Sequence, residues 1–498
     1  MRNSIDKYFL VSVLVLVSFA SVVRVIRAAD YVPTEKFLLN CGDTYEATAE
    51  DGRKWMPDVG SKLLGAGNSL VSKAATQHPA VPSVPYMSAR VFRSNFTYSF
   101  PVVAGRKFIR LYFYSSSYDG LHAANALFSV TAGSYTLLRN LSVSQTSEAL
   151  NYAFLIKEYS VNVDGEMLNV TFSPSSTASN AYAFVNGIEV MSMPDIYSNT
   201  GGRLMIVGYT TPFIIDNSTA LETVYRLNVG GNDIPPSEDD TGLFRSWSED
   251  LPYIFGAGVG VRVAADPNVT FNYKGIPPYT APKTVYATAR SMGPYSAVNA
   301  QSNLTWLFSV DSGFNYLIRL HFCEFTESIT LINQRVFNVF LNNQTAQEGA
   351  DVIAWAGGNR NIGVPLYMEF VVLVPGGGLQ QDLWLELHPD IAAKPEYYDA
   401  ILNGVEIFKI SHKSGNLAGL NPIPAPKNEV KPSLVLPPHS GHSNLKTITA
   451  VGISGGVAVA LIVGFYLFAA SRRHKHGMLP SASDDPENTA LIKSDNNR

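Results

Sequence analysis

The chain of 498 residues contains only two cysteines, Cys41 and Cys323, and this scarcity excludes several classes of protein. A small domain held by disulfides, or a metal site built on several thiolates, needs more thiols than this chain has. Charged residues make up 16% of the chain, whereas an average globular protein has roughly 25%. The net charge is −4, so the chain has no basic excess that could bind a nucleic-acid backbone.

Apolar residues are plentiful at 46%, which is enough for large hydrophobic cores. Both cysteines lie in apolar runs, so we expect two buried free thiols. A disulfide between them is the alternative. It would require Cα atoms within ~7 Å of each other, and the sequence does not establish that distance.

The two ends of the chain predict a secreted protein that is anchored in a membrane. Residues 1–29 have a basic start, an apolar run and then small residues, as in a secretory signal peptide; an uncleaved N-terminal anchor is the alternative. Residues 447–470 form a second apolar run without charge, long enough to cross a hydrocarbon core of about 30 Å as a helix. Arg472 and Arg473 follow, as is typical of the cytosolic side. We therefore expect a single-pass type I protein with a short cytosolic tail, residues 471–498.

Seven N-glycosylation sequons agree with this orientation, because all of them lie between the signal peptide and the membrane helix. A sequon of the form Asn-x-Ser/Thr indicates a surface position in a secreted protein. The predicted glycosylation sites are Asn95, Asn140, Asn169, Asn217, Asn268, Asn303 and Asn343.

Three sequence motifs occur twice in the same order, which indicates a tandem duplication. The pairs are FLLNCGD (37–43) with YRLNVGG (225–231), FIRLYF (108–113) with LIRLHF (317–322), and AFVNGIEVMSM (183–193) with AILNGVEIFKI (400–410). Alternating apolar residues and β-branched or aromatic runs bounded by turn residues predict strands throughout. The predicted fold is therefore all-β, with two tandem β-sandwiches and one transmembrane helix.

The duplication also predicts the domain boundaries. The first domain is expected at 30–205 and the second at 206–411. Residues 412–446 are rich in proline, serine and glycine, so we expect an extended juxtamembrane stalk there.

The sequence contains no convincing catalytic or metal-binding pattern. The histidines are scattered, and the one G-x-S-x-G motif lies inside the predicted membrane helix without partners for hydrolysis. We therefore expect no catalytic residues, no metal and no cofactor. Small residues recur every fourth position along that helix, which predicts a face for close helix packing. Its members are Gly452, Gly456, Ala460 and Gly464.

The segments SEDDTGLFRSWSEDLPYIFGAG, TAPKTVYATARSMG, NQRVFNVFLNNQTA and PEYYDAILNGVEIFKI resemble the ectodomain of plant malectin-like receptor kinases, the FERONIA and THESEUS group. The resemblance covers roughly residues 34–412 and implies two malectin-like sandwiches outside the plasma membrane, in the apoplast. It also implies binding of a secreted alkalinisation-type peptide, together with a glycosylphosphatidylinositol-anchored co-receptor. The family carries a kinase domain after the membrane helix. Residues 471–498 contain no kinase motif.

The resemblance therefore predicts a non-enzymatic cell-surface receptor-like protein that acts with a malectin-like receptor kinase. We expect the second unit, residues 225–410, to present the main protein-binding surface. The alternatives are a decoy, a carbohydrate-binding protein that anchors the cell wall, or a glycoside hydrolase. A hydrolase would need two carboxylates about 5–9 Å apart across a groove.

The similarity to animal malectin implies a possible carbohydrate site in the first unit. Aromatic rings that stack on sugars and a carboxylate that accepts their hydroxyls are suited to this role. The candidate ligand-binding residues are Tyr112, Tyr114, Tyr118 and Asp119. The alternative is that these aromatic residues, which alternate along a strand, belong to the core. Cell-wall polysaccharide is thus a further candidate partner.

Overall fold

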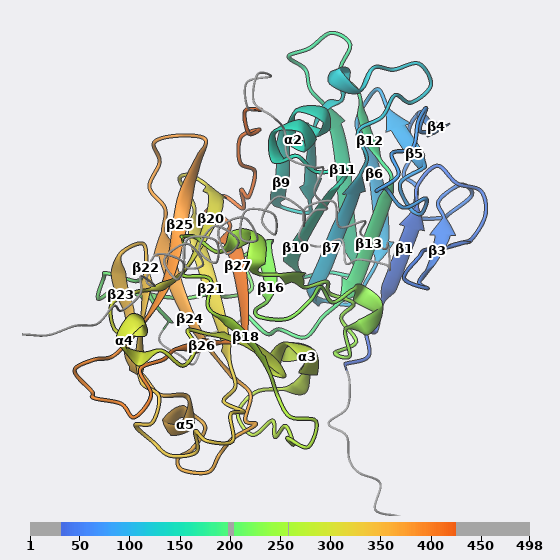
Figure 1. Cartoon of the computed structure of the whole chain (residues 1–498). Helices are drawn as coiled ribbons and strands as arrows, with labels where there is room; N and C mark the ends of the chain where they lie inside the picture. Colours follow the sequence, from blue (N-terminus) through green and yellow to red (C-terminus); the bar gives the residue numbers. More distant parts are fainter. Residues whose placement is uncertain (1–30, 198–203, 257, 425–498) are drawn as a thin grey trace, which may run out of the picture. The chain divides into compact units, whose positions relative to one another are not determined.

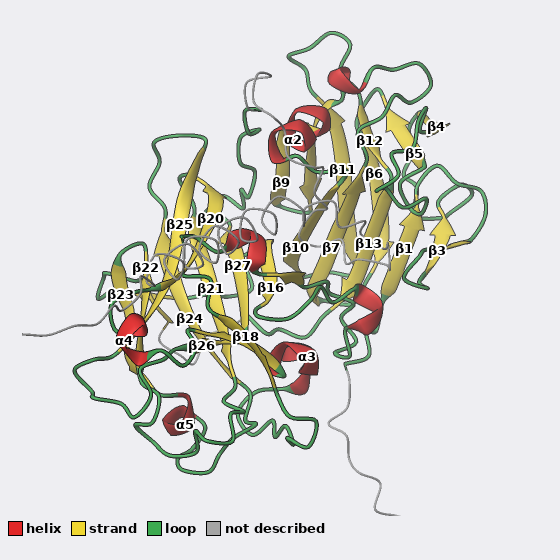
Figure 2. Cartoon of the chain, viewed as in Figure 1, coloured by secondary structure: helices red, strands yellow, loops and turns green. Residues whose placement is uncertain are grey.

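The computed structural model describes residues 31–197, 204–256 and 258–424. Strands dominate within these ranges, as Figure 2 shows, and the predicted all-β class is confirmed. Helices in the described ranges are short: α2 (Val143–Leu150), α3 (Lys283–Tyr286), α4 (Ser296–Asn299) and α5 (Val352–Trp355), with 3₁₀ turns at Ala123–Asn125, Pro236–Glu238, Leu251–Tyr253 and Pro278–Thr280.

Three predicted segments lie wholly outside the described residues: the signal peptide (1–29), the membrane helix (447–470) with its packing face, and the tail (471–498). Residues 425–446 of the predicted stalk lie outside them as well. Among the residues that are described, no helix is long and apolar enough to span a membrane.

One large sheet runs through both halves of the chain (Figure 1). We call strands β1–β13 the first half and strands β16–β27 the second half. The sheet order is β2 (Ala47–Thr48), β3 (Lys54–Pro57), β1 (Lys36–Asn40), β13 (Gly187–Ser192), β7 (Gly105–Phe113), β10 (Leu155–Val163), β16 (Leu221–Asn228), β27 (Gly404–Ile410), β21 (Asn315–Phe322) and β24 (Leu366–Leu373), with β17 (Ser248–Glu249) paired to β16. The halves join where β10 pairs antiparallel with β16.

Each half adds two smaller sheets with the same strand order. The first half has β6 (Phe96–Pro101), β11 (Met167–Pro174), β8 (Leu127–Ala132) and β9 (Tyr135–Ser142), and also β12 (Ala183–Val185), β5 (Ser88–Phe92) and β4 (Ser69–Lys73). The second half has β20 (Leu304–Asp311), β25 (Gln380–Pro389), β22 (Phe337–Leu341) and β23 (Gln344–Ala350), and also β26 (Ile401–Leu402), β19 (Thr288–Ser291) and β18 (Val261–Ala264). The three motif pairs found in the sequence occupy corresponding strands of the two halves.

Each half has its own hydrophobic core, which packs on one face of the large sheet that runs through both halves. We call this sheet the joint sheet; its opposite face is covered as well. On β7, Ile109 and Leu111 point into the core of the first half, while Phe108 belongs to a third apolar cluster on the opposite face. That cluster includes Tyr197 and Leu243, from segments between the strands of the sheet. Strand β7 is therefore buried on both faces.

The segment after the last strand of the second half returns to the first half. We call residues 411–424 the strap. Thr136 N of β9 donates to Gly415 O (3.0 Å), Leu417 N donates to Thr136 O (2.9 Å), and the Leu417 side chain is 0% exposed in the core of the first half. The beginning of the segment predicted to be a stalk (412–446) is therefore structured, because one apolar side chain finds a core there.

The segment between the halves includes a short hairpin, β14 (Leu204–Met205) with β15 (Pro212–Phe213). After β14, Val207 N donates to Val371 O (2.8 Å) of β24, the last strand of the joint sheet. Both cysteines are free and buried, as expected.

Candidate functional site

A row of acidic and basic side chains crosses the joint sheet on the face away from the two main cores. The seven members alternate in charge along neighbouring strands, and we call them the charge ladder: Glu189, Arg110, Glu158, Arg226, Glu406, Arg319 and Glu369, from β13, β7, β10, β16, β27, β21 and β24. At the junction of the halves, the two carboxylate oxygens of Glu158 contact different arginines: Oε2 lies 2.5 Å from Nε of Arg110, and Oε1 lies 2.7 Å from Nη2 of Arg226. The ladder therefore continues from one half into the other.

Six of the seven ladder residues are buried, and Glu369 at one end is half-buried, so the charges depend on one another. Burial alone would raise the pKa of Glu189, but Arg110 and Arg53 outweigh that effect and lower it. Burial opposes ionisation of Glu406 too, yet a hydrogen bond from His321 and the charge of Arg226 hold its pKa well below the usual range. These carboxylates stay ionised, whereas a general acid for glycoside hydrolysis must carry a proton. The ladder is a structural joint.

The sequence analysis missed the ladder, although the signal was present. Arg110 and Arg319 stand at the centre of the repeated FIRLYF and LIRLHF motifs, and Glu189 and Glu406 stand in the NGIEV and NGVEI motifs. A charged residue at the same place in both copies of an apolar strand indicates a buried partner, because burying an unpaired charge is costly.

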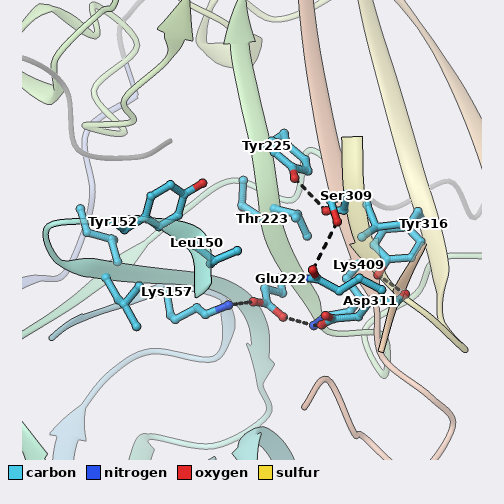
Figure 3. A pocket seen from close by; sticks show the side chains of 15 residues that line it. Leu150, Tyr152, Lys157, Glu222, Thr223, Tyr225, Ser309, Asp311, Tyr316 and Lys409 are labelled. Atoms are coloured by element: carbon cyan, nitrogen blue, oxygen red, sulfur yellow. Dashed lines mark hydrogen bonds and ion pairs between the residues drawn. The ribbon is translucent and has the colours of Figure 1, made fainter. Parts of the chain in front are cut away.

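A small pocket lies at the junction of the halves (Figure 3). Glu222 of β16 lies 2.8 Å from Lys157 of β10 and 2.5 Å from Lys409 of β27, and Lys409 lies 2.7 Å from Asp311. The two ammonium groups outweigh burial and lower the pKa of Glu222. The pocket is lined by these charged residues together with apolar ones such as Leu150 and Val310. Its charged groups are paired with one another, so we assign the pocket to the joint.

Three of the four candidate carbohydrate-binding residues lie in the interior. Tyr112 donates through its hydroxyl to Glu189 (2.9 Å), and Tyr118 donates to the carbonyl of Tyr114 (2.9 Å). All three tyrosines are nearly inaccessible, while Asp119 is exposed in a turn with φ of 51°. In this structure the three rings have no face open to a ligand, and sugar binding by these residues stays a prediction.

The seven predicted glycosylation sites are all exposed, at Asn95, Asn140, Asn169, Asn217, Asn268, Asn303 and Asn343. In the described ranges no group of histidine, cysteine or acidic residues could hold a metal ion.

The second half carries an exposed apolar surface that the sequence analysis did not locate. We call it the β18 surface; its members are Phe255, Val259, Val261, Tyr295 and Val298, each between 45% and 73% exposed. Two of these residues contact strand β19: Val261 pairs with Ser291, and Arg290 donates to the carbonyl of Val259 (2.9 Å). Several large apolar side chains exposed together indicate a protein-binding surface. The signal in the sequence is the uncharged run FGAGVGV.

The comparisons with known proteins agree with this organisation. The malectin-like domain family matches residues 39–410. The chain is similar to the receptor-like protein kinase FERONIA of Arabidopsis thaliana, at 60% identity over 481 residues, which is 96% of this chain and 53% of that protein. It is 41% identical over 444 residues to the receptor-like protein kinase ANXUR1 of Arabidopsis thaliana, covering 87% of this chain and 50% of that protein. The chain thus spans about half the length of these curated relatives.

Solved structures give the same result at the level of the fold. The crystal structure of the plant receptor-like kinase FER has a TM-score of 0.74 and 62% identity, covering 78% of this chain and 100% of that chain. The crystal structure of the plant peptide RALF23 in complex with FER and LLG2 has the same TM-score and identity, covering 79% of this chain and 100% of that chain. The described residues therefore have the fold of these ectodomains.

Proposed function

Because this chain belongs to the malectin-like domain family, we propose that it is a plasma-membrane receptor-like protein that recognises a secreted peptide of the alkalinisation type. The observation that carries the proposal is the likeness to FER, whose structure with the peptide RALF23 and LLG2 is similar to this chain at 62% identity. The proposed complex contains a glycosylphosphatidylinositol-anchored co-receptor and a malectin-like receptor kinase as the signalling partner.

We further propose that the chain has no enzymatic activity of its own and acts through binding. Supporting this, the charged groups of the ladder and of the junction pocket are paired with one another, and the second half carries the exposed apolar β18 surface. We interpret the halves as two tandem malectin-like sandwiches, with boundaries near 30–205 and 206–411, facing the apoplast. Cell-wall polysaccharide stays a further candidate ligand.

The β18 surface is the proposed contact site for the peptide and its co-receptor. It lies in the second half, its side chains are apolar, and strand β18 is the outer strand of its sheet within the described residues. Apolar side chains beside a free strand edge suit a protein partner, because backbone hydrogen bonds and side-chain burial can be combined there.

A matched pair of variants tests this site. Val261→Lys places a charge in the middle of the β18 surface, and Val71→Lys makes the same change on β4, the corresponding strand of the first half; both valines are about half exposed, at 45% and 51%. Binding of the full chain to a synthetic alkalinisation-type peptide is measured with the co-receptor present. We expect at least a tenfold loss of affinity for Val261→Lys and less than twofold for Val71→Lys. Equal affinity for both variants would refute the assignment.

A further inference from the structure

The four-stranded sheets have four outer edges in total, and the chain covers three of them. An uncovered edge exposes a row of backbone N–H and C=O groups that can pair with another chain. The edges in question belong to β6 and β9 in the first half and to β20 and β23 in the second half.

Strands β6 and β20 are covered by local segments in equivalent ways. Gly65 N donates to Thr97 O (2.8 Å) and Ser99 N donates to Leu63 O (2.9 Å), so residues 63–65 cover β6. In the second half, Phe255 N donates to Thr305 O (2.9 Å), which covers part of β20.

Strand β9 is covered by the strap, through the bonds of Thr136 to Gly415 and Leu417. Farther along β9, Asn421 Nδ2 donates to the carbonyl of Asn140 (2.7 Å). The strap therefore occupies this edge over most of its length.

In the described ranges strand β23 has backbone pairing only with β22, although Gly208 lies against the side chain of its first residue, Gln344. Most of its residues are exposed or half-buried, from Gln344 to Gly349, and Glu348 is its only charged residue. It contains no proline and no lysine, the residues that most often protect an edge. The second half thus keeps one open edge at the position that the strap covers in the first half.

The turn that leads into β23 carries a glycosylation sequon. Asn342 and Asn343 both have positive φ, at 50° and 60°, as required in the tight turn that joins β22 to β23. Asn343 is exposed and begins the sequon Asn343-Gln344-Thr345. The corresponding turn of the first half, Gly133-Ser134, has no sequon.

We propose that an N-glycan on Asn343 covers the open edge of β23 and keeps the chain from pairing with a second copy through this edge. A glycan is bulky and strongly hydrated, so at the start of the edge it obstructs the approach of another strand. It takes the place that the strap has in the first half. The proposal rests on secretion of the chain, and it is independent of which ligand the β18 surface binds.

Three variants at one position test the proposal without disturbing the strained turn. Thr345→Ala removes the sequon, Thr345→Ser keeps it, and Thr345→Lys removes it while placing a charge on the edge. The full chain is produced in plant cells as two copies with different epitope tags, and the fraction that co-purifies after detergent extraction is measured. Peptide mass spectrometry of the parent protein reports the glycan on Asn343.

We expect a severalfold increase in co-purification for Thr345→Ala, and parental values for Thr345→Ser and Thr345→Lys. Enzymatic deglycosylation of the folded parent protein should reproduce the increase, so a folding defect of the variant does not decide the result. Equal co-purification of the alanine and serine variants, or an unmodified Asn343 in the parent, would overturn the proposal. Peptide binding is measured in parallel and should be the same for all variants. If the parent protein does not bind the peptide, that result contradicts the proposed function and leaves the glycan proposal unaffected.

Discussion

Removing Arg226 should loosen the joint between the two halves. Its guanidinium group lies 2.7 Å from Glu158 and 2.9 Å from Glu406, with both acids and the arginine at 0–1% side-chain exposure. Arg226→Met keeps most of the volume and removes the charge. Glu158 then loses one of its two arginine contacts and keeps the contact to Arg110, with its side chain only 1% exposed.

The expected magnitude follows from this burial. Breaking a buried ion pair by removing one partner costs about 3–5 kcal/mol, because the other charge remains buried and undercompensated. A surface pair provides the contrast: Lys54 lies 2.9 Å from Glu46, with side chains 72% and 44% exposed. Lys54→Met should therefore cost about 0–1 kcal/mol.

The assay is urea unfolding of the full chain, followed by tryptophan fluorescence, for Arg226→Met, Glu158→Gln and the double variant. Because the two residues contact each other, we expect the double variant to be more stable than the sum of the single effects by about 1–3 kcal/mol. An unfolding midpoint for Arg226→Met equal to that of Lys54→Met would refute the interpretation of the ladder as the joint.

Three further predictions concern acid, the strap and the thiols. Folding lowers the pKa of Glu406 below its unfolded value of 4.5. The ionised Glu406 side chain therefore stabilises the fold above pH 4.5, and this stabilisation is lost as the pH falls toward the folded pKa. In Glu406→Gln, the unfolding midpoint should fall less steeply below pH 4.5 than in the parent protein. Leu417→Asp should release the strap and speed proteolysis after residue 410, whereas Leu420→Asp should not, because Leu420 is 66% exposed. Burial raises the pKa of Cys41 and Cys323, so both thiols should react with a thiol reagent only in denaturant; labelling of the native chain would contradict this.

The fold class could be predicted from the sequence because alternating and β-branched patterns survive in single strands such as FIRLYF. The union of the halves into one sheet could not be predicted, because β10 and β16 pair across a long segment and neither carries a local sign of its neighbour. The buried tyrosines show the same limit. Tyr112 and Tyr118 are residues of a type that is suited to a sugar site, and only the packing around them shows that their rings face the interior.

The strap illustrates how composition can mislead. Residues 411–424 contain glycine, asparagine and proline, so local preference favours an extended, solvated segment. The buried side chain of Leu417, two backbone bonds to Thr136 and hydrogen bonds from Asn421 to Asn140 and from Gln145 to Pro422 hold it nonetheless. Such contacts depend on an edge contributed by residues far away in the sequence.

The route of the strap also determines how the chain responds to tension. A pull on residue 424 reaches Pro422, Asn421 and Leu417 before it reaches Ile410. The load therefore falls first on β9 and α2 of the first half. Only when those contacts yield does the force pass to β27. A released strap can then extend by up to roughly 3.3–3.6 Å per residue, and the core of the first half loses the Leu417 side chain. We therefore expect the strap to be the first element that detaches when the chain is pulled from residue 424.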